Sequence, residues 1–194
     1  LLEYAQRDSR IAVTFLERNA GIAGATNAGI AASRGRYVAL MDHDDLLAPD
    51  ALACVAHTIA SNPQGRLFYT DSDRIDAKGS HVAAFHKPEF DYELLLGQNY
   101  LNHDGAQDYD LYLRAVEAID TAQVVHIPRV LYHWREVESS VSTSGLAAAA
   151  AAGRRAVQDH LQRRELPGKV RANPDALIYN RIEWSGKLSQ LPVL

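Results

Sequence analysis

The sequence predicts an α/β protein built on a mixed, mostly parallel sheet flanked by helices. Residues 37–41 are apolar and partly β-branched or aromatic, which is typical of a buried strand in a parallel sheet. Three carboxylates follow within four positions, and Pro49 then opens a helical pattern. A second apolar run, residues 67–70, is again followed by acids. Strand, acidic loop and helix in this order place a ligand site at the carboxyl end of a sheet.

Helical and strand-like patterns alternate along the chain. Helices are predicted, from helical spacing or from the six alanines at 147–152, at 1–8 (a helix end), 25–33, 49–61, 92–96 (a short turn), 109–118 and 147–161. Strands are predicted at 11–16, 37–41, 67–70, 82–85 (a hairpin return), 124–127 and 130–134. We expect one domain over residues 1–165. Residues 166–194, rich in Pro, Gly and polar residues, are expected to be a linker or an edge strand.

The composition is that of an ordinary globular protein. The 194 residues are 47% hydrophobic and 23% charged, with a formal net charge of -4. Lysines and arginines are scattered, so we expect no nucleic-acid partner. The single cysteine, Cys54, excludes a disulfide framework and favours a reducing compartment, the cytoplasm. The sequence contains no apolar run of about 18 residues that would span a membrane.

The acidic loop after residues 37–41 is the first candidate site. Asp42, Asp44 and Asp45 repel one another unless a cation neutralises them, so we expect a divalent metal at Asp42 and Asp44. The alternative is a solvated acidic turn in which Asp45 or Asp50 caps the next helix. An EF-hand is excluded, because Leu47 occupies its glycine position.

A second acidic group follows residues 67–70. It contains Asp71, Asp73 and Asp76. Because two successive strands end in carboxylates, a site shared between the two groups is more plausible than either site alone.

An ordered series of short motifs runs through the chain. These are Asn19-x-Gly21, Ala25-Thr-Asn27-x-Gly29, Gly35-Arg-Tyr37, Leu40-Met-Asp-His-Asp-Asp-Leu-Leu-Ala-Pro49, Tyr69-Thr-Asp-Ser-Asp73, Lys87-Pro88, Gln98-Asn-Tyr100, Asp104-Gly-Ala-Gln-Asp-Tyr-Asp-Leu111 and His126-Ile-Pro-Arg-Val-Leu-Tyr-His-Trp-Arg135. The series resembles family 2 inverting glycosyltransferases, which have the GT-A fold, and in particular the branch that builds rhamnose-rich and O-antigen-type bacterial polysaccharides. The resemblance covers roughly residues 18–161.

The resemblance implies a role for the acidic residues. Asp42 and Asp44 match the family's Asp-x-Asp motif, with Asp44 as the more direct metal ligand and Asp42 toward the ribose. Asp108 matches the general base, although it could instead cap the helix that follows. Asp71 and Asp73 match a second acidic pair near the donor sugar and the acceptor.

Three further residues are weaker candidates. His133 matches a position that reaches the metal or the diphosphate in some GT-A enzymes, but a histidine in an aromatic strand is as often a satisfied core residue. Arg18 and Asn27 could line the nucleotide pocket, or could pair and cap locally.

The resemblance also implies a reaction. A sugar would move with inversion from a UDP- or dTDP-linked donor to a glycan or lipid-linked acceptor, at the inner face of the membrane with peripheral association. Oxygen ligands at a phosphate site favour Mg²⁺ or Mn²⁺, which would stabilise the departing diphosphate.

The chain departs from the family pattern at two places. The family's first strands, ending in Pro-x-Tyr-Asn and in an Asp-Asp pair, do not precede Leu1, and a Gly-Gly-Phe turn ahead of the general base is missing. We expect a longer chain, since a sheet without its first strands exposes a hydrophobic edge. The tail after Arg181 resembles a connector to a second glycosyltransferase domain.

Two other functions stay open. If the nucleotide-holding strands are truly absent, the chain would be a catalytically silent GT-A-like module that binds polysaccharide or scaffolds partner enzymes. A nucleotidyltransferase would need a basic loop for a triphosphate, and the sequence shows none.

Overall fold

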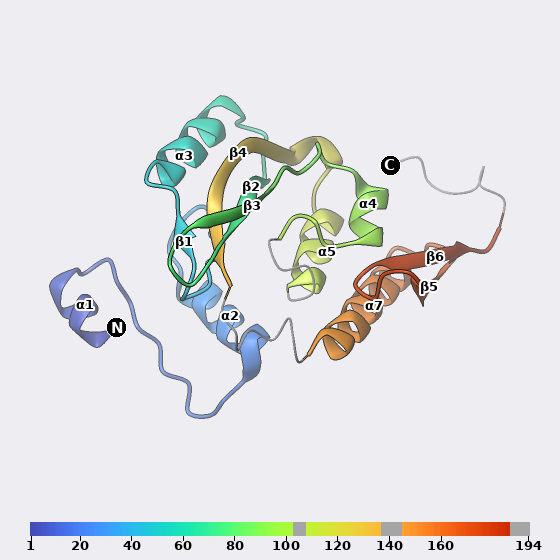
Figure 1. The fold of residues 1–194 in the computed structure, drawn as a ribbon, viewed down its shortest axis with the longest axis horizontal. Coiled ribbons are helices and arrows are strands. Elements are labelled where there is room, and N and C mark those ends of the chain that lie inside the picture. Colours follow the sequence, from blue (N-terminus) through green and yellow to red (C-terminus); the bar gives the residue numbers. More distant parts are fainter. Residues whose placement is uncertain (103–107, 137–144, 187–194) are drawn as a thin grey trace. The chain divides into compact units, whose positions relative to one another are not determined.

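A computed structural model describes residues 1–102, 108–136 and 145–186, and the chain divides into two units, residues 1–42 and 43–194 (Figure 1). The first unit contains helices joined by extended chain. The second contains two sheets and the remaining helices.

Two helices form the regular structure of the first unit. α1 spans Leu2–Arg7 and α2 spans Gly21–Ala32. α2 begins four residues before the start predicted at residue 25. The strands predicted at 11–16 and 37–41 are wrong, because this unit, described throughout, forms no strand. A strand is stable only where a neighbouring strand pairs with its backbone, and neither stretch has such a neighbour within the unit.

A four-stranded sheet of order β1-β4-β2-β3 forms the centre of the second unit. β2 (Leu67–Ile75) and β4 (Val124–Arg135) make a long parallel pair at its middle. β1 (Leu46–Leu47) and β3 (His81–Phe85) are short antiparallel edges. The predicted class, a mixed α/β sheet flanked by helices, is confirmed, with the parallel pairing concentrated in the long central pair.

Two register shifts interrupt the ladder between β2 and β4. Thr70 pairs with Ile127, Asp71 with Val130 and Ser72 with Tyr132, so Pro128, Arg129 and Leu131 have no partner position in the ladder. Proline lacks an N–H to donate, and a bulge is a position where a strand tolerates it. The strands predicted at 124–127 and 130–134 are therefore one strand whose pairing with β2 shifts register twice.

β2 is longer than the sequence predicted. It continues through Asp71 and Asp73 to Ile75, so these two acids lie within the strand and do not follow it. The turn around Lys78 and Gly79 then leads into β3, as expected.

The predicted helices of the second unit are confirmed to within two residues at each end. They are α3 (Ala51–Ser61), α4 (Tyr92–Gly97), α5 (Tyr109–Glu117) and α7 (Leu146–Arg163). α3 packs against β4, where Ala51 meets Ile127 and Leu131. The larger core joins the other three helices to β2 and β4, and its fully buried side chains are Leu95, Leu96, Leu113, Val157 and Leu161.

A C-terminal hairpin adds a second, two-stranded sheet. β5 (Gly168–Ala172) and β6 (Asn180–Trp184) pair antiparallel, and β5 packs on α7 (Figure 1). Val170, Ile182 and Trp184 lie partly buried against the larger core. The part of residues 166–194 that the structure describes is thus packed on the rest of the second unit, and the domain boundary at 165 stays a prediction. No helix in the described ranges is long and apolar enough to cross a membrane.

Candidate functional site at the carboxyl ends of the central strands

The carboxyl ends of β2 and β4 bring acids and histidines together. Asp73 of β2 lies opposite His133 of β4, and Leu46 of β1 lies opposite the same histidine from the other side. Asp44 and Asp45 directly precede Leu46, so this short edge strand holds the end of the acidic loop at the same end of the sheet.

Asp73 joins two histidines. Its Oδ1 lies 2.7 Å from Nδ1 of His133 and its Oδ2 lies 2.6 Å from Nδ1 of His81. The carboxylate is buried, whereas His81 is exposed. A neutral imidazole that donates Nδ1–H to a carboxylate keeps the lone pair of its Nε2, which is the nitrogen that such a contact leaves for another partner.

This group has the composition of a metal site. Among the described residues, Asp73, His81 and His133 form a compact group of potential ligands, with ligand atoms within 4.8 Å of one another. A carboxylate that holds Nδ1–H of a histidine is the usual outer partner of a metal-bound Nε2. In this arrangement Asp73 would orient the rings and the imidazole nitrogens would be the metal ligands, which suit Mn²⁺ better than Mg²⁺, since Mg²⁺ prefers oxygen.

Asp71 is the centre of a second group on β2. Its carboxylate accepts from the Lys87 N–H at 3.0 Å and contacts His126 Nε2 at 2.8 Å and His86 Nδ1 at 3.0 Å. Burial is the largest influence and would raise the pKa of Asp71. The three hydrogen bonds together outweigh it, so the pKa lies below its ordinary value. Asp71 is therefore held as a carboxylate.

The Lys87 ammonium lies close to this second group. Its Nζ donates to the Leu101 carbonyl at 2.9 Å. Burial lowers the pKa of Lys87 to about 8, although the nearby Asp71 carboxylate opposes the shift. An amine with this pKa is still mostly cationic at neutral pH, so it can contribute positive charge beside Asp71.

The acidic loop is attached to β4 by Asp45. This buried carboxylate accepts from the Tyr132 hydroxyl at 2.5 Å and from the Arg135 N–H at 2.8 Å. Nε of Arg135 donates to the Asp44 carbonyl at 2.8 Å. Asp45 thus fixes the loop and does not cap α3, and Asp50, at the capping position, makes no side-chain capping bond within the described structure.

Asp108 lies at the start of α5. Its backbone is left-handed, with φ 58°, and its carbonyl accepts from the Tyr112 N–H at 3.1 Å. In the described part of the chain its side chain makes no capping bond to α5, so the alternative role as a side-chain cap has no support. Residues 103–107, which carry the rest of its motif, lie outside the described residues.

The predicted site residues fall into three places. Asp71, Asp73 and His133 come together on the sheet, with Asp44 at the same end of it. Asp108 belongs to α5. The remaining candidates, Asp42, Asn27 and Arg18, belong to the first unit, where Asn27 lies in α2 and Arg18 in the loop before it.

Sequence reasoning missed His81 and His126 as members of this site, and it gave Asp45 a different role. These three residues make the contacts that orient the predicted residues. Period-two alternation could have placed Asp71 and Asp73 on one face of β2, had the strand been extended through them. No local signal pairs His81 with Asp73, since that pairing depends on the hairpin register.

The fold and the site define a mixed α/β domain with a metal-compatible acid and histidine group at the carboxyl ends of its central strands. The family model described as Glycosyl transferase family 2 matches residues 1–118, so the chain belongs to glycosyl transferase family 2. The GT-A fold expected from the sequence motifs is the fold of this family.

The chain also resembles curated proteins. It is 40% identical over 184 residues to an uncharacterized protein of Sinorhizobium fredii, covering 84% of this chain and 20% of that protein. It is 39% identical over 184 residues to the O-antigen biosynthesis protein RfbC of Myxococcus xanthus, covering 84% and 14%. It is 26% identical over 135 residues to a chondroitin synthase of Pasteurella multocida, covering 59% and 14%. The chain spans a fifth or less of the length of these relatives.

Proposed function

We propose that the chain is part of a metal-dependent, inverting hexosyltransferase that uses a UDP- or dTDP-linked sugar donor. The acceptor would be a glycan or a lipid-linked glycan in bacterial surface polysaccharide synthesis. The family supports the transferase activity, and the name of the relative from Myxococcus xanthus supports the polysaccharide class. Work on a lipid-linked acceptor would take place at the inner face of the membrane.

One observation carries this proposal. The Asp73–His133 contact of 2.7 Å lies at the same sheet end as the acidic loop that Asp45 attaches to β4. Asp73 holds the His133 ring by Nδ1, which leaves Nε2 for a metal. Asp44 and His133, with Asp42 toward the ribose, would then hold Mg²⁺ or Mn²⁺ at the diphosphate. A metal bound there would stabilise the charge that develops on the departing diphosphate.

The chain's own residues would carry the rest of the reaction. The acceptor hydroxyl attacks the anomeric carbon from the face opposite the diphosphate, and Asp108 takes the hydroxyl proton. The new glycosidic C–O bond forms as the bond to the diphosphate breaks, and the nucleoside diphosphate leaves with the electron pair. A positioned base of this kind contributes about 10²- to 10⁴-fold to the rate.

Calorimetric titration of UDP and dTDP, with and without Mn²⁺, tests donor binding. Binding of one nucleotide should require the metal, and Mn²⁺ should support tighter binding than Mg²⁺ because His133 contributes nitrogen. Asp44→Asn should abolish the metal-dependent part. Asp159→Asn is the matched control, because Asp159 is exposed on α7. If neither UDP nor dTDP binds when the metal is present, that result would contradict the transferase and favour a silent polysaccharide-binding or scaffolding module.

The assigned base has its own test. Asp108→Asn should leave nucleotide affinity unchanged and reduce release of UDP from UDP-glucose or dTDP from dTDP-rhamnose by about 10²-fold or more. Turnover that survives this substitution would refute the assignment of Asp108.

A further inference from the structure

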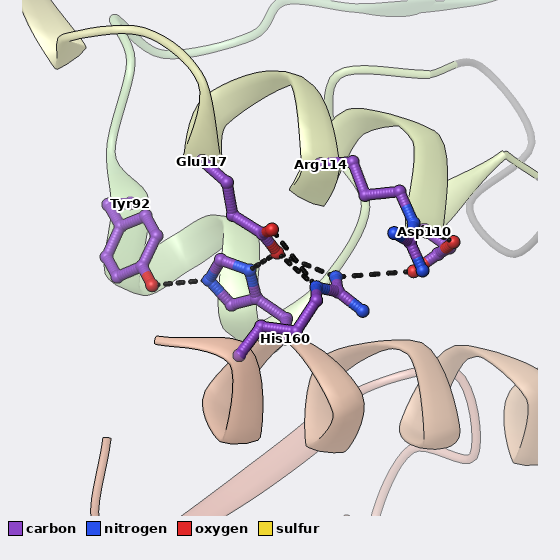
Figure 2. Close-up of polar contacts among 6 residues, drawn as sticks. Tyr92, Asp110, Arg114, Glu117 and His160 are labelled. Atoms are coloured by element: carbon purple, nitrogen blue, oxygen red, sulfur yellow. Dashed lines mark hydrogen bonds and ion pairs between the residues drawn. The ribbon is translucent and has the colours of Figure 1, made fainter. Parts of the chain in front are cut away.

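α5, which carries Asp108 at its start, is held at both ends. Figure 2 shows the far end, where Glu117 of α5 reaches the ring of His160 on α7, and Tyr92 of α4 lies on the other side of that ring. The Glu117 carboxylate lies 2.6 Å from His160 Nδ1, and the Tyr92 hydroxyl lies 2.5 Å from Nε2. The C-terminal end of α5 is thus tied to two other helices.

The electrostatics of this far end fix its hydrogen-bond directions. Burial lowers the pKa of His160, and burial raises the pKa of Tyr92 to about 12. The ring is therefore neutral and the phenol protonated at neutral pH. Nδ1–H of His160 donates to Glu117, and Nε2 accepts from Tyr92. Every polar atom of the ring has a partner, which makes this end a rigid anchor.

The near end of α5 is held by Tyr109, the residue after Asp108. Tyr109 is 3% exposed, and its hydroxyl donates to the Leu95 carbonyl of α4. Asn180 of β6 donates through Nδ2 to the Tyr109 hydroxyl at 3.5 Å and to the Leu96 carbonyl at 3.2 Å. The Tyr109 oxygen therefore both donates and accepts. The C-terminal hairpin reaches, through Asn180, the residue beside the proposed base.

α7 closes the remaining side of the Tyr109 ring. A Cβ placed on Gly153 would lie 3.3 Å from Cδ1 of Tyr109, so the glycine lets the ring pack directly on the helix backbone. The ring is thereby held by α4, α7 and β6. The backbone of Tyr109 is therefore fixed too, and so is the peptide bond that joins Tyr109 to Asp108.

Asp108 needs such support. Its φ of 58° lies in the left-handed region, which residues other than glycine adopt uncommonly, although aspartate tolerates it better than most. Uncommon backbone conformations persist where the surrounding structure over-determines them. The immobile Tyr109 on the C-terminal side supplies that constraint.

We propose that Tyr109 and Asn180 are positioning residues, which hold Asp108 in its left-handed conformation and thereby aim its carboxylate at the acceptor hydroxyl. This inference rests on the proposed role of Asp108 as base. It makes the C-terminal hairpin, which lies beyond the residues that match the family model, a support of the catalytic helix.

A first experiment measures positioning without activity. Hydrogen exchange of the full chain reports on the Tyr112 amide, which donates to the Asp108 carbonyl. Tyr109→Phe removes the hydroxyl, and Asn180→Ala removes its second partner. Each should speed exchange at this amide by about ten-fold, since the first turn of α5 opens more often. Arg171→Gln, on the exposed face of the same hairpin, is the control and should leave the exchange unchanged. Unchanged exchange in both test variants would overturn the proposal.

A second experiment measures the consequence for transfer. With UDP-glucose or dTDP-rhamnose, whichever releases nucleotide faster, each variant should lower kcat by about ten-fold while the donor KM stays within about two-fold. In an Asp108→Asn background, Tyr109→Phe should cause no further loss, because the phenol acts through the carboxylate. A further loss of equal size in that background would overturn the positioning role.

The two experiments distinguish the role of Asp108 as base from the anchoring of α5 by Tyr109 and Asn180. Faster exchange together with full turnover in Asp108→Asn would refute Asp108 as base and leave the anchoring of α5 intact. Unchanged exchange together with a dead Asp108→Asn variant would keep the base and refute the anchoring.

Discussion

The first unit, residues 1–42, and the second unit, residues 43–194, contain apolar segments of the same kind. The second unit buries its apolar segments far more completely than the first. In the first unit Phe15 is 74% exposed and Val38 is 48% exposed, and none of its 42 residues, all described, is buried. In the second unit Tyr69 and Leu131, which occupy equally apolar segments, are 4% and 2% exposed. The two units differ because β2 and β4 pair with each other and helices pack against them, which covers the apolar side chains of the second unit.

This contrast shows what an apolar pattern specifies and what it leaves open. The pattern marks a segment that gains free energy when it leaves water, at about 25 cal/mol per Å² of apolar surface. It does not supply the neighbour that takes up the backbone hydrogen bonds. The apolar side chains of the first unit therefore stay exposed, because no strand forms within that unit.

The largest expected effect comes from truncating a core residue of the second unit, and the matched truncation of an exposed apolar residue in the first unit should have almost none. Leu113→Ala in the second unit, where the side chain is 0% exposed, should lower the free energy of unfolding by about 2–5 kcal/mol. Ile22→Ala in the first unit, where the side chain is 54% exposed, should change it by no more than about 0.5 kcal/mol. Urea denaturation monitored by circular dichroism measures both. Equal losses would break the contrast and indicate that the first unit is buried in the intact protein.

A smaller effect is expected from polar contacts. His160→Gln removes a fully buried ring that contacts Glu117 and Tyr92, and should lower the free energy of unfolding by about 1–3 kcal/mol, since buried polar groups lose partners. The matched change in the first unit, Asp8→Asn, breaks a contact with Arg10 that lies in solvent, and should leave the melting temperature unchanged. A larger drop in melting temperature for Asp8→Asn than for His160→Gln would contradict the contrast between the two units.

The burial of His160 also predicts that the stability of the protein depends on pH. The pKa of His160 in the folded chain lies below its ordinary 6.5 because burial penalises the cation. The unfolded chain therefore binds the proton first as the pH falls, so the stability that His160 contributes is complete above pH 6.5 and declines below it. The melting temperature of the unsubstituted protein should drop below pH 6.5 more steeply than that of His160→Gln. Parallel curves would refute the buried neutral ring.

The smallest effect is expected on the outer face of the hairpin. Arg171 and Glu183 pair at 3.0 Å, and about half of each side chain is exposed. Arg171→Ala should lower the free energy of unfolding by less than about 0.5 kcal/mol, because exposed ion pairs are screened by water and salt. A loss comparable to that of His160→Gln would show that this face is covered in the intact protein.

Helices were the part of the fold that the sequence predicted best. α3, α5 and α7 follow from spacing and alanine content within one segment, so local information was enough. Strands were predicted less well because they depend on distant partners. Acids from Asp71 onward are typical of a loop, yet β2 continues through them, and Pro128 lies within β4 although proline is rare inside a strand.

The sequence predicts which residue types form the candidate site better than it predicts how those residues contact one another. Residue types alone indicated acids after a strand, and the motif series added His133 and Asp108. The contact between Asp73 and His133 joins residues 60 positions apart and depends on the register of a parallel pair. Asn180 and Tyr109 are 71 positions apart, and no periodicity connects them. Such contacts are set by tertiary packing and leave no mark on local sequence.

The register shifts of β4, which skip Pro128, Arg129 and Leu131, make the site sensitive to chain length. Leu67 pairs with Val124 and Asp73 pairs with His133, so an advance of six residues along β2 is matched by nine along β4. Without the extra residues, Asp73 would face Val130, and an aliphatic side chain would stand where the imidazole now meets the carboxylate. A deletion next to Pro128 should therefore dismantle the acid and histidine group even though it removes none of its members. Substitutions there that preserve the residue count should be tolerated.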